Sequence, residues 1–121
     1  MEINIFDDPN KVPQPKDEIK IESLTAQVYP DRFRVRIDIE VTAFQERPNL
    51  LLVMKDASGQ IINELNIIAT MHAVMDFTMH MRGMDDPAGT YTIDAELFYE
   101  TRRPPQDSAH CTFVIPTETQ E

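Results

Sequence analysis

The sequence predicts an all-β fold, a sandwich of seven antiparallel strands packed as two sheets. Several stretches alternate apolar and polar residues with a period of two. A half-buried strand requires this period, because successive side chains point to opposite faces of a sheet. Turn-forming residues separate these stretches about every 8–12 residues, a spacing typical of sandwiches. The chain has 121 residues, of which 41% are hydrophobic, which is enough for one domain with a buried core.

The rest of the chain is organised around residues 87–100, which fit a turn ending at Gly89 and then a long strand. The face of this strand expected to be buried carries Tyr91, Ile93, Ala95, Leu97 and Tyr99. The opposite face carries Thr92, Asp94, Glu96, Phe98 and Glu100. Phe98 is therefore the single large apolar side chain on the polar face.

Six further strands are expected, over residues 19–29, 33–42, 49–55, 61–68, 76–82 and 109–115. In the first of these the apolar phase reverses at Ser23, which predicts a bulge. The stretch 49–55 is apolar on both faces, and the turn over 56–60, with Gly59 in a positive-φ position, makes it a hairpin with 61–68. The apolar spacing of 61–75 also fits a helix, but the crowding of β-branched side chains favours the strand.

The two ends of the chain are expected to lie outside the sandwich. Residues 1–18 contain Pro9, Pro13 and Pro15, which predicts a flexible, extended N-terminal arm, since proline interrupts helices and removes ladder donors. The apolar residues near its start could dock a partner or lie on the domain itself. Residues 117–121 form a short acidic tail, so the domain is expected over 19–116.

The strand order resembles that of immunoglobulin-like domains of the fibronectin type III and bacterial kinds, over residues 19–116. The resemblance rests on the strand count, the 56–59 hairpin and the Gly89-Thr90-Tyr91 motif. In that superfamily such a motif opens the sixth strand, and its tyrosine hydroxyl bonds to backbone as the tyrosine corner, which implies this role for Tyr91. Ile93 stands where antibody domains have a cysteine and the chain has no Trp, so an antibody-type domain is excluded. The resemblance implies an immunoglobulin-like β-sandwich and no particular function.

Charge excludes several classes of partner. The formal net charge is −10, whereas a nucleic-acid or anionic-membrane surface must be met by Lys and Arg. We therefore expect neither a nucleic-acid partner nor a membrane partner. Cys111 is the only cysteine, so no disulfide can form within the chain. The N-terminal residues lack the basic and apolar regions of a secretory signal, which predicts a cytoplasmic protein.

The segment 71–84 is rich in soft metal ligands: Met71, His72, Met75, Met79, His80, Met81 and Met84. Thioether and imidazole groups suit copper, so a copper-binding sandwich is the alternative function. Strand geometry opposes it, because Met79 and Met81 share a face with Phe77 as core filler while His80 points the other way. We therefore expect neither a metal site nor a cofactor.

The sequence also gives little support for a catalytic site. Cys111 and His110 are neighbours in a strand, so their side chains leave opposite faces and cannot form a nucleophile–base dyad. Cys111 shares parity with Phe113 and Ile115, which predicts a small buried hydrophobe. Acidic pairs such as Asp85 and Asp86 are typical of solvated turns. The sequence thus predicts a protein that is not an enzyme.

The most informative anomaly lies on an outer face. If the third, sixth and seventh strands share a sheet, four apolar side chains point away from the core: Leu51, Val53, Phe98 and Val114. Glu96 and its acidic neighbours would form a polar rim, an arrangement typical of protein interfaces. We expect an interaction or assembly module that binds a partner protein or a second copy here, unless the arm or residues 61–75 cover the face. Sugar binding is a weaker hypothesis, because such sites usually present aromatic platforms.

Overall fold

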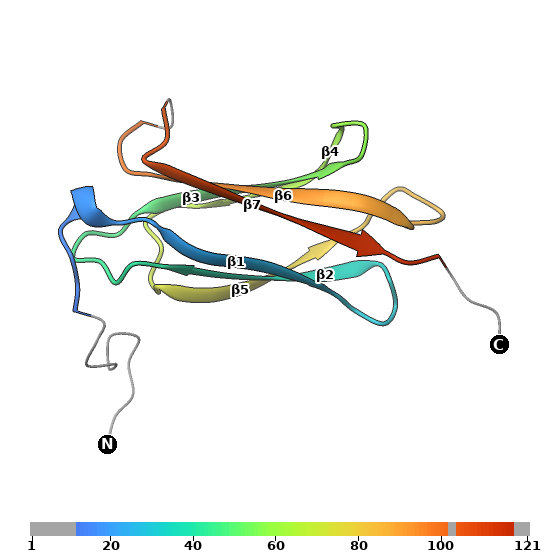
Figure 1. The fold of residues 1–121 in the computed structure, drawn as a ribbon, viewed down its shortest axis with the longest axis horizontal. Helices are drawn as coiled ribbons and strands as arrows, with labels where there is room; N and C mark the ends of the chain where they lie inside the picture. The colour runs from blue at the N-terminus through green and yellow to red at the C-terminus, as the bar shows by residue number, and fades with distance from the viewer. Residues whose placement is uncertain (1–11, 102–103, 118–121) are drawn as a thin grey trace, which may run out of the picture.

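In the computed structural model, residues 12–101 and 104–117 are described, and they form a sandwich of two antiparallel sheets (Figure 1). The strands are β1 (Ile21–Val28), β2 (Arg34–Val41), β3 (Asn49–Asp56), β4 (Ile61–Ile67), β5 (Val74–His80), β6 (Gly89–Phe98) and β7 (Asp107–Ile115). One sheet has the order β1-β2-β5 and the other β4-β3-β6-β7. The predicted all-β sandwich of seven antiparallel strands in two sheets is confirmed, and β4 is a strand rather than a helix. The described part of the chain contains no helix of the length and apolarity needed to cross a bilayer.

The core lies between the two sheets and is built from the inward positions that alternation predicts. Val35, Ile37, Leu50, Leu52, Met54, Ile93, Ala95, Leu97 and Ile115 are all completely buried. β3 pairs with β6 in continuous register from Asn49↔Phe98 to Asp56↔Tyr91. This pairing puts the two most buried strands of the four-stranded sheet side by side at its centre. The outward residues of β3 and β6 therefore share the opposite face.

Two local predictions of chain geometry are confirmed. The register of β1 against β2 shifts between Ile21 and Ser23, at the point where the apolar phase reverses. In the β3–β4 turn Gly59 has a φ of 91°. The Asp56 carboxylate accepts hydrogen bonds from the backbone N–H groups of Ser58 and Gln60, each 2.9 Å long. These two donors lower the pKa of Asp56, together with the Ser58 hydroxyl, whose hydrogen bond contributes most.

Tyr91 makes the side-chain-to-backbone hydrogen bond that the resemblance to immunoglobulin-like domains implied. Its side chain is buried and its hydroxyl donates to the Pro87 carbonyl at 2.7 Å. The ring also stacks on Phe113 of β7, with the centroids 5.5 Å apart. The hydrogen bond fixes the entry of the chain into β6, and the stack fixes β6 against β7.

The part of the arm that the structure describes lies on the domain. Gln14 forms a parallel bridge with Phe44, and its backbone N–H donates to the Ala43 carbonyl at 2.8 Å. After Pro15 the chain makes a single 3-10 turn, η1 (Lys16–Glu18), one turn of helix that the proline spacing did not predict. The apolar residues Ile3, Ile5 and Phe6, considered as a docking motif, lie outside the described residues.

Candidate functional site

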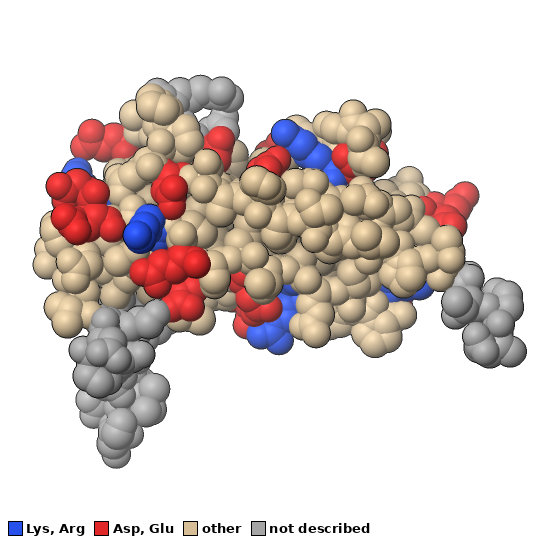
Figure 2. All heavy atoms as spheres, in the orientation of Figure 1, with Lys and Arg blue, Asp and Glu red and all other residues tan. Residues whose placement is uncertain are grey.

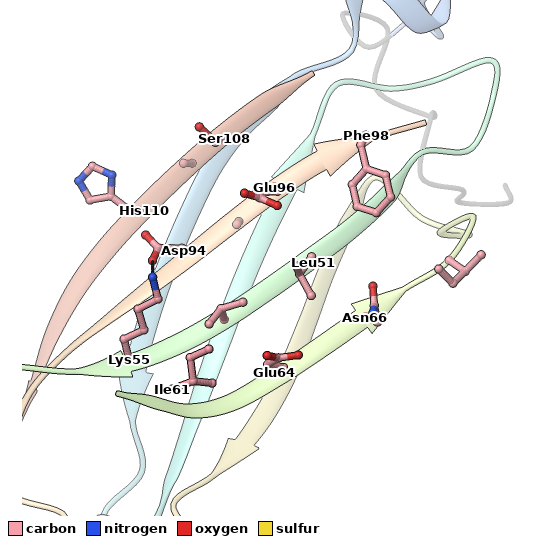
Figure 3. A pocket seen from close by; sticks show the side chains of 14 residues that line it. Leu51, Lys55, Ile61, Glu64, Asn66, Asp94, Glu96, Phe98, Ser108 and His110 are labelled. Carbon is pink, nitrogen blue, oxygen red and sulfur yellow. Dashed lines mark ion pairs between the residues drawn. The ribbon is translucent and has the colours of Figure 1, made fainter. Parts of the chain in front are cut away.

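The outer face of the four-stranded sheet carries a shallow, open depression of about 790 Å³ (Figure 3). We call it the outer depression. Its lining residues are Leu51, Val53, Lys55, Ile61, Glu64, Asn66, Ile68, Asp94, Ala95, Glu96, Phe98, Ser108, Ala109 and His110. In Figure 3 the labelled side chains of β4, β3, β6 and β7 stand on the same side of the sheet. All four strands therefore contribute to one surface.

Strand register arranges these side chains in rows across the sheet. One row is Glu64, Val53, Asp94 and His110, and the next is Asn66, Leu51, Glu96 and Ser108. The apolar side chains of β3 thus form the middle of each row, with polar groups on β4 and β6 at both sides. Phe98 opposes Asn49 one step further along, and Ile61 lies beside Lys55 at the other end.

Asn49 positions the end of the depression that contains Ile68 and Phe98. Its side-chain amide donates to the Tyr99 carbonyl at 2.6 Å, just beyond β6. Its side-chain oxygen accepts a hydrogen bond of 2.7 Å from the Ala69 N–H, just beyond β4. The Asn49 side chain therefore links the two segments that leave the sheet directly after Phe98 and Ile68.

The depression is negatively charged. Lys55 pairs with Asp94 across 3.5 Å, and both side chains are 41% exposed. Glu64 and Glu96 also line the surface, so three carboxylates stand against one ammonium group. Acidic side chains therefore outnumber Lys and Arg side chains around the apolar middle of the depression. Figure 2 shows that acidic side chains also gather at the end of the molecule where β1 and β7 begin.

The structure brings together four of the five residues predicted to bind a partner. Leu51, Val53, Phe98 and Glu96 all line the outer depression. Leu51 is only 8% exposed, and its register partners Asn66 and Glu96 stand on both sides of it. Val53 and Phe98 are half-buried. The apolar centre of the depression is therefore less exposed to solvent than the outward parity of these residues would indicate.

Val114 does not belong to this surface. It points outward as predicted and is 61% exposed, but its partner in the register is Thr90, at the far end of β6 from Phe98. Along β7 it lies four residues beyond His110, which is about 13 Å of strand. The parity of Val114 was predicted correctly, whereas its membership of one contiguous patch was wrong, because parity does not give register.

β4 supplies the part of the site that sequence reasoning missed. Ile61, the first residue of β4, and Ile68, which directly follows this strand, are 50% and 71% exposed. They are the most exposed apolar residues of the depression. Glu64 and Asn66 lie between them. The hairpin over 56–60 already placed this strand beside β3, so its alternation could have added Glu64, Asn66 and Ile68 to the predicted surface. Ile61 has the opposite parity and lies opposite Lys55 because the β3–β4 register shifts between Met54 and Lys55.

Neither residues 61–75 nor the described residues of the arm, 12–18, close the depression. The lining residues come from the four strands and from Ile68. The described arm residues pair instead with the 43–45 segment, through Gln14 and Gln45. Within the described ranges, the outer face of this sheet is thus open between β4 and β7.

The soft-ligand residues at the end of β5 lie on opposite sides of the sheet. Met79 and Met81 are buried in the core, whereas His80 is exposed on the outer side of β5. Thr70 donates to the sulfur of Met75 at 2.9 Å. No group of three or more His, Cys, Asp or Glu side chains suited to a metal ion occurs in the described residues.

Cys111 and His110 point to opposite sides of β7, as predicted. Cys111 packs against the core, and burial raises the pKa of its thiol, with the Asp94 charge adding to the effect. His110 lines the outer depression in the same row as Asp94. A raised thiol pKa is the reverse of what a cysteine nucleophile needs, so these two residues do not form a catalytic pair.

No protein-family model matches the sequence, and no curated protein matches it. Solved structures resemble the fold. A β-glucuronidase of Bifidobacterium dentium, in complex with coumarin-3-O-glucuronide, matches 80% of this chain with a TM-score of 0.54 and 17% identity. A glycosyl hydrolase family 2 member from Bacteroides cellulosilyticus matches 80% of the chain with a TM-score of 0.51 and 10% identity.

These matches concern a segment of much longer proteins. The chain spans 18% of the first enzyme and 15% of the second. At such low identity the likeness establishes the fold alone. The chain therefore has a β-sandwich architecture that also occurs as one segment within glycosyl hydrolases of family 2.

Proposed function

We propose that this protein is a non-enzymatic interaction module that binds a partner protein through the outer depression. The observation that carries the proposal is an apolar stripe on the outer face of a sheet, bordered by carboxylates. Val53, Phe98 and Ile68 supply partly or fully exposed apolar surface there. Such a stripe with a polar rim is the composition of a protein interface.

The chemistry of the surrounding residues supports binding over catalysis. The depression is open and its acidic groups are spread over β4 and β6 rather than gathered around one reacting atom. Cys111, the one thiol, faces the core. A binding role requires only the shape, apolar surface and charge that these residues provide.

We further propose that the domain belongs to the immunoglobulin-like superfamily in its fibronectin type III form. The sheet orders β1-β2-β5 and β4-β3-β6-β7 support this assignment, as does the hydrogen bond from Tyr91 to Pro87. Its likeness to a segment of longer enzymes agrees with a fold that serves as a component beside other domains. Function on such a fold lies in its exposed faces, which again directs attention to the outer depression.

The test compares three substitutions of apolar outer-face residues. Phe98→Asp and Ile68→Asp place a charge in the depression, whereas Val114→Asp places the same charge on the same sheet outside it. Tagged variants are expressed in the cells that naturally make the protein, and the amount of co-purified partner is quantified. We expect the first two to lose the partner and Val114→Asp to retain it.

Folding is controlled separately in this test. Ile68 is 71% exposed, so its substitution leaves the core untouched even if Phe98→Asp weakens the sheet. Circular dichroism identifies any variant that is unfolded. Retention of the partner by folded Ile68→Asp and Phe98→Asp, or its loss only in Val114→Asp, would refute binding through the depression.

A further inference from the structure

We propose that the occupant of the outer depression is a basic amphipathic α-helix of a partner protein, lying along β3. This inference rests on the proposed function and adds the chemistry and shape of the partner. Three features carry it: the charge of the depression, the position of that charge on both sides of an apolar stripe, and the dimensions of the stripe.

The charge selects a cationic partner. Among the described residues that line the depression, Glu64, Asp94 and Glu96 carry carboxylates and Lys55 carries an ammonium group. Complementary potentials favour a partner that brings Lys or Arg, and like charges placed opposite one another are unfavourable. A second copy of this chain using the same face would set carboxylates against carboxylates. Charge therefore disfavours a symmetric dimer through this surface and favours a basic segment.

The position of the charges indicates how that segment lies. In one row of the sheet Glu64 stands on one side of Val53 and Asp94 on the other. These two carboxylates are separated by two strand spacings, about 9.6 Å. A helix with its side chains is about 10–12 Å across, so cations on both flanks of its apolar face would reach both carboxylates at once.

The length of the stripe agrees with a short helix. Apolar groups begin with Ile68 and Phe98 at one end and finish with Ile61 at the other. The register between Asn49 and Lys55 covers six residue steps of β3, about 20 Å. A helix of about 13 residues has this length. Covering an apolar sheet face with a helix is also a common way to complete a layered domain.

The test uses three synthetic peptides of about 15 residues, a length that spans the stripe, and the full-length protein. The first is helical, with a Leu stripe flanked on both sides by Lys. The second replaces every Lys with Glu, and the third alternates Lys and Val to form an extended strand. Fluorescence anisotropy measures each affinity. We expect the first peptide to bind at least about tenfold more tightly than the other two.

Charge-reversal variants separate a specific site from general attraction to an acidic protein. Glu64→Lys and Asp94→Lys are each expected to lower the affinity for the helical basic peptide by about threefold or more. Asp85→Lys changes the net charge equally but lies in the loop before β6, outside the depression, so its effect should stay below about twofold.

The helix proposal would be overturned if Asp85→Lys lowered the affinity for the helical basic peptide as much as Glu64→Lys and Asp94→Lys do. It would also be overturned if the extended peptide bound more tightly than the helical basic peptide. That failure is distinguishable from failure of the proposed function. If Ile68→Asp still releases the natural partner while the helical basic peptide does not bind, the outer depression remains the interaction surface and the proposed partner chemistry is wrong.

Discussion

The Tyr91 hydroxyl and the Pro87 carbonyl are joined by a buried hydrogen bond of 2.7 Å. The bond spans the point where the chain enters β6, the strand that pairs with both β3 and β7. Burial raises the pKa of Tyr91, and the charges of Asp56 and Asp86 add to this effect. The phenol therefore remains a neutral donor well above neutral pH, and the entry to the central strand stays fixed.

Tyr91→Phe is expected to destabilise the protein by about 1–3 kcal/mol, because it leaves the Pro87 carbonyl buried without its donor. Urea unfolding followed by circular dichroism measures the change. Tyr29→Phe is the matched control. The Tyr29 hydroxyl makes only an exposed contact of 3.4 Å with Thr78, so its loss should cost less than about 0.5 kcal/mol. Equal costs for the two variants would contradict a structural role for the Tyr91 bond.

Arg32 links three separate segments from a left-handed backbone position, with a φ of 69°. Its guanidinium donates to the Pro116 carbonyl at 2.9 Å and to the Asp86 carboxylate at 2.7 Å. Arg32→Ala and Arg32→Gly both lose these bonds, but glycine tolerates the positive φ. We therefore expect Arg32→Ala to be less stable than Arg32→Gly by about 1 kcal/mol. A lower melting temperature for Arg32→Gly than for Arg32→Ala would contradict a left-handed backbone at Arg32.

Tyr99 gives the protein an alkaline pH dependence. Burial, together with the nearby charge of Glu46, raises its pKa to about 12, against about 10 in an unfolded chain. Between these values the folded state retains a proton that the unfolded state has lost, so the free energy of unfolding must fall as pH rises from about 10 to about 12. Below about pH 10 this contribution is fully present.

Absorbance titration of the phenolate tests this directly. The wild-type protein is expected to show a step at the Tyr99 pKa of about 12. Tyr99→Phe should remove that step and flatten the loss of stability between about pH 10 and 12. Tyr99→Phe also removes the hydrogen bond of 2.9 Å to the Glu46 carbonyl, so stabilities are compared as slopes against pH. An unchanged slope in Tyr99→Phe would assign the alkaline transition to other groups.

Alternation in the sequence was sufficient to predict the fold, because it reports which side chains face the core. The phase reversal at Ser23 predicted the β1 bulge, and the Gly89-Thr90-Tyr91 motif implied the hydrogen bond that Tyr91 makes. Both depend on residues close together in the chain, where local chemistry determines the geometry.

The candidate surface was harder to predict, because it depends on which residues become neighbours across strands. Parity placed Val114 on the correct face, but only the β6–β7 register shows that it opposes Thr90 rather than lying near Phe98. The burial of Leu51 depends on its cross-strand neighbours Asn66 and Glu96. The contribution of β4 required the complete sheet order.

Site-specific photo-cross-linking tests most directly whether the outer depression binds a partner. A benzoylphenylalanine probe replaces Asn66, an exposed residue of the depression, or Thr25, an exposed residue on the outer side of β1. After irradiation in the cells that naturally make the protein, we expect a discrete adduct with a partner protein from position 66 and none from position 25. An adduct from position 25 alone, or no adduct from position 66, would contradict the account.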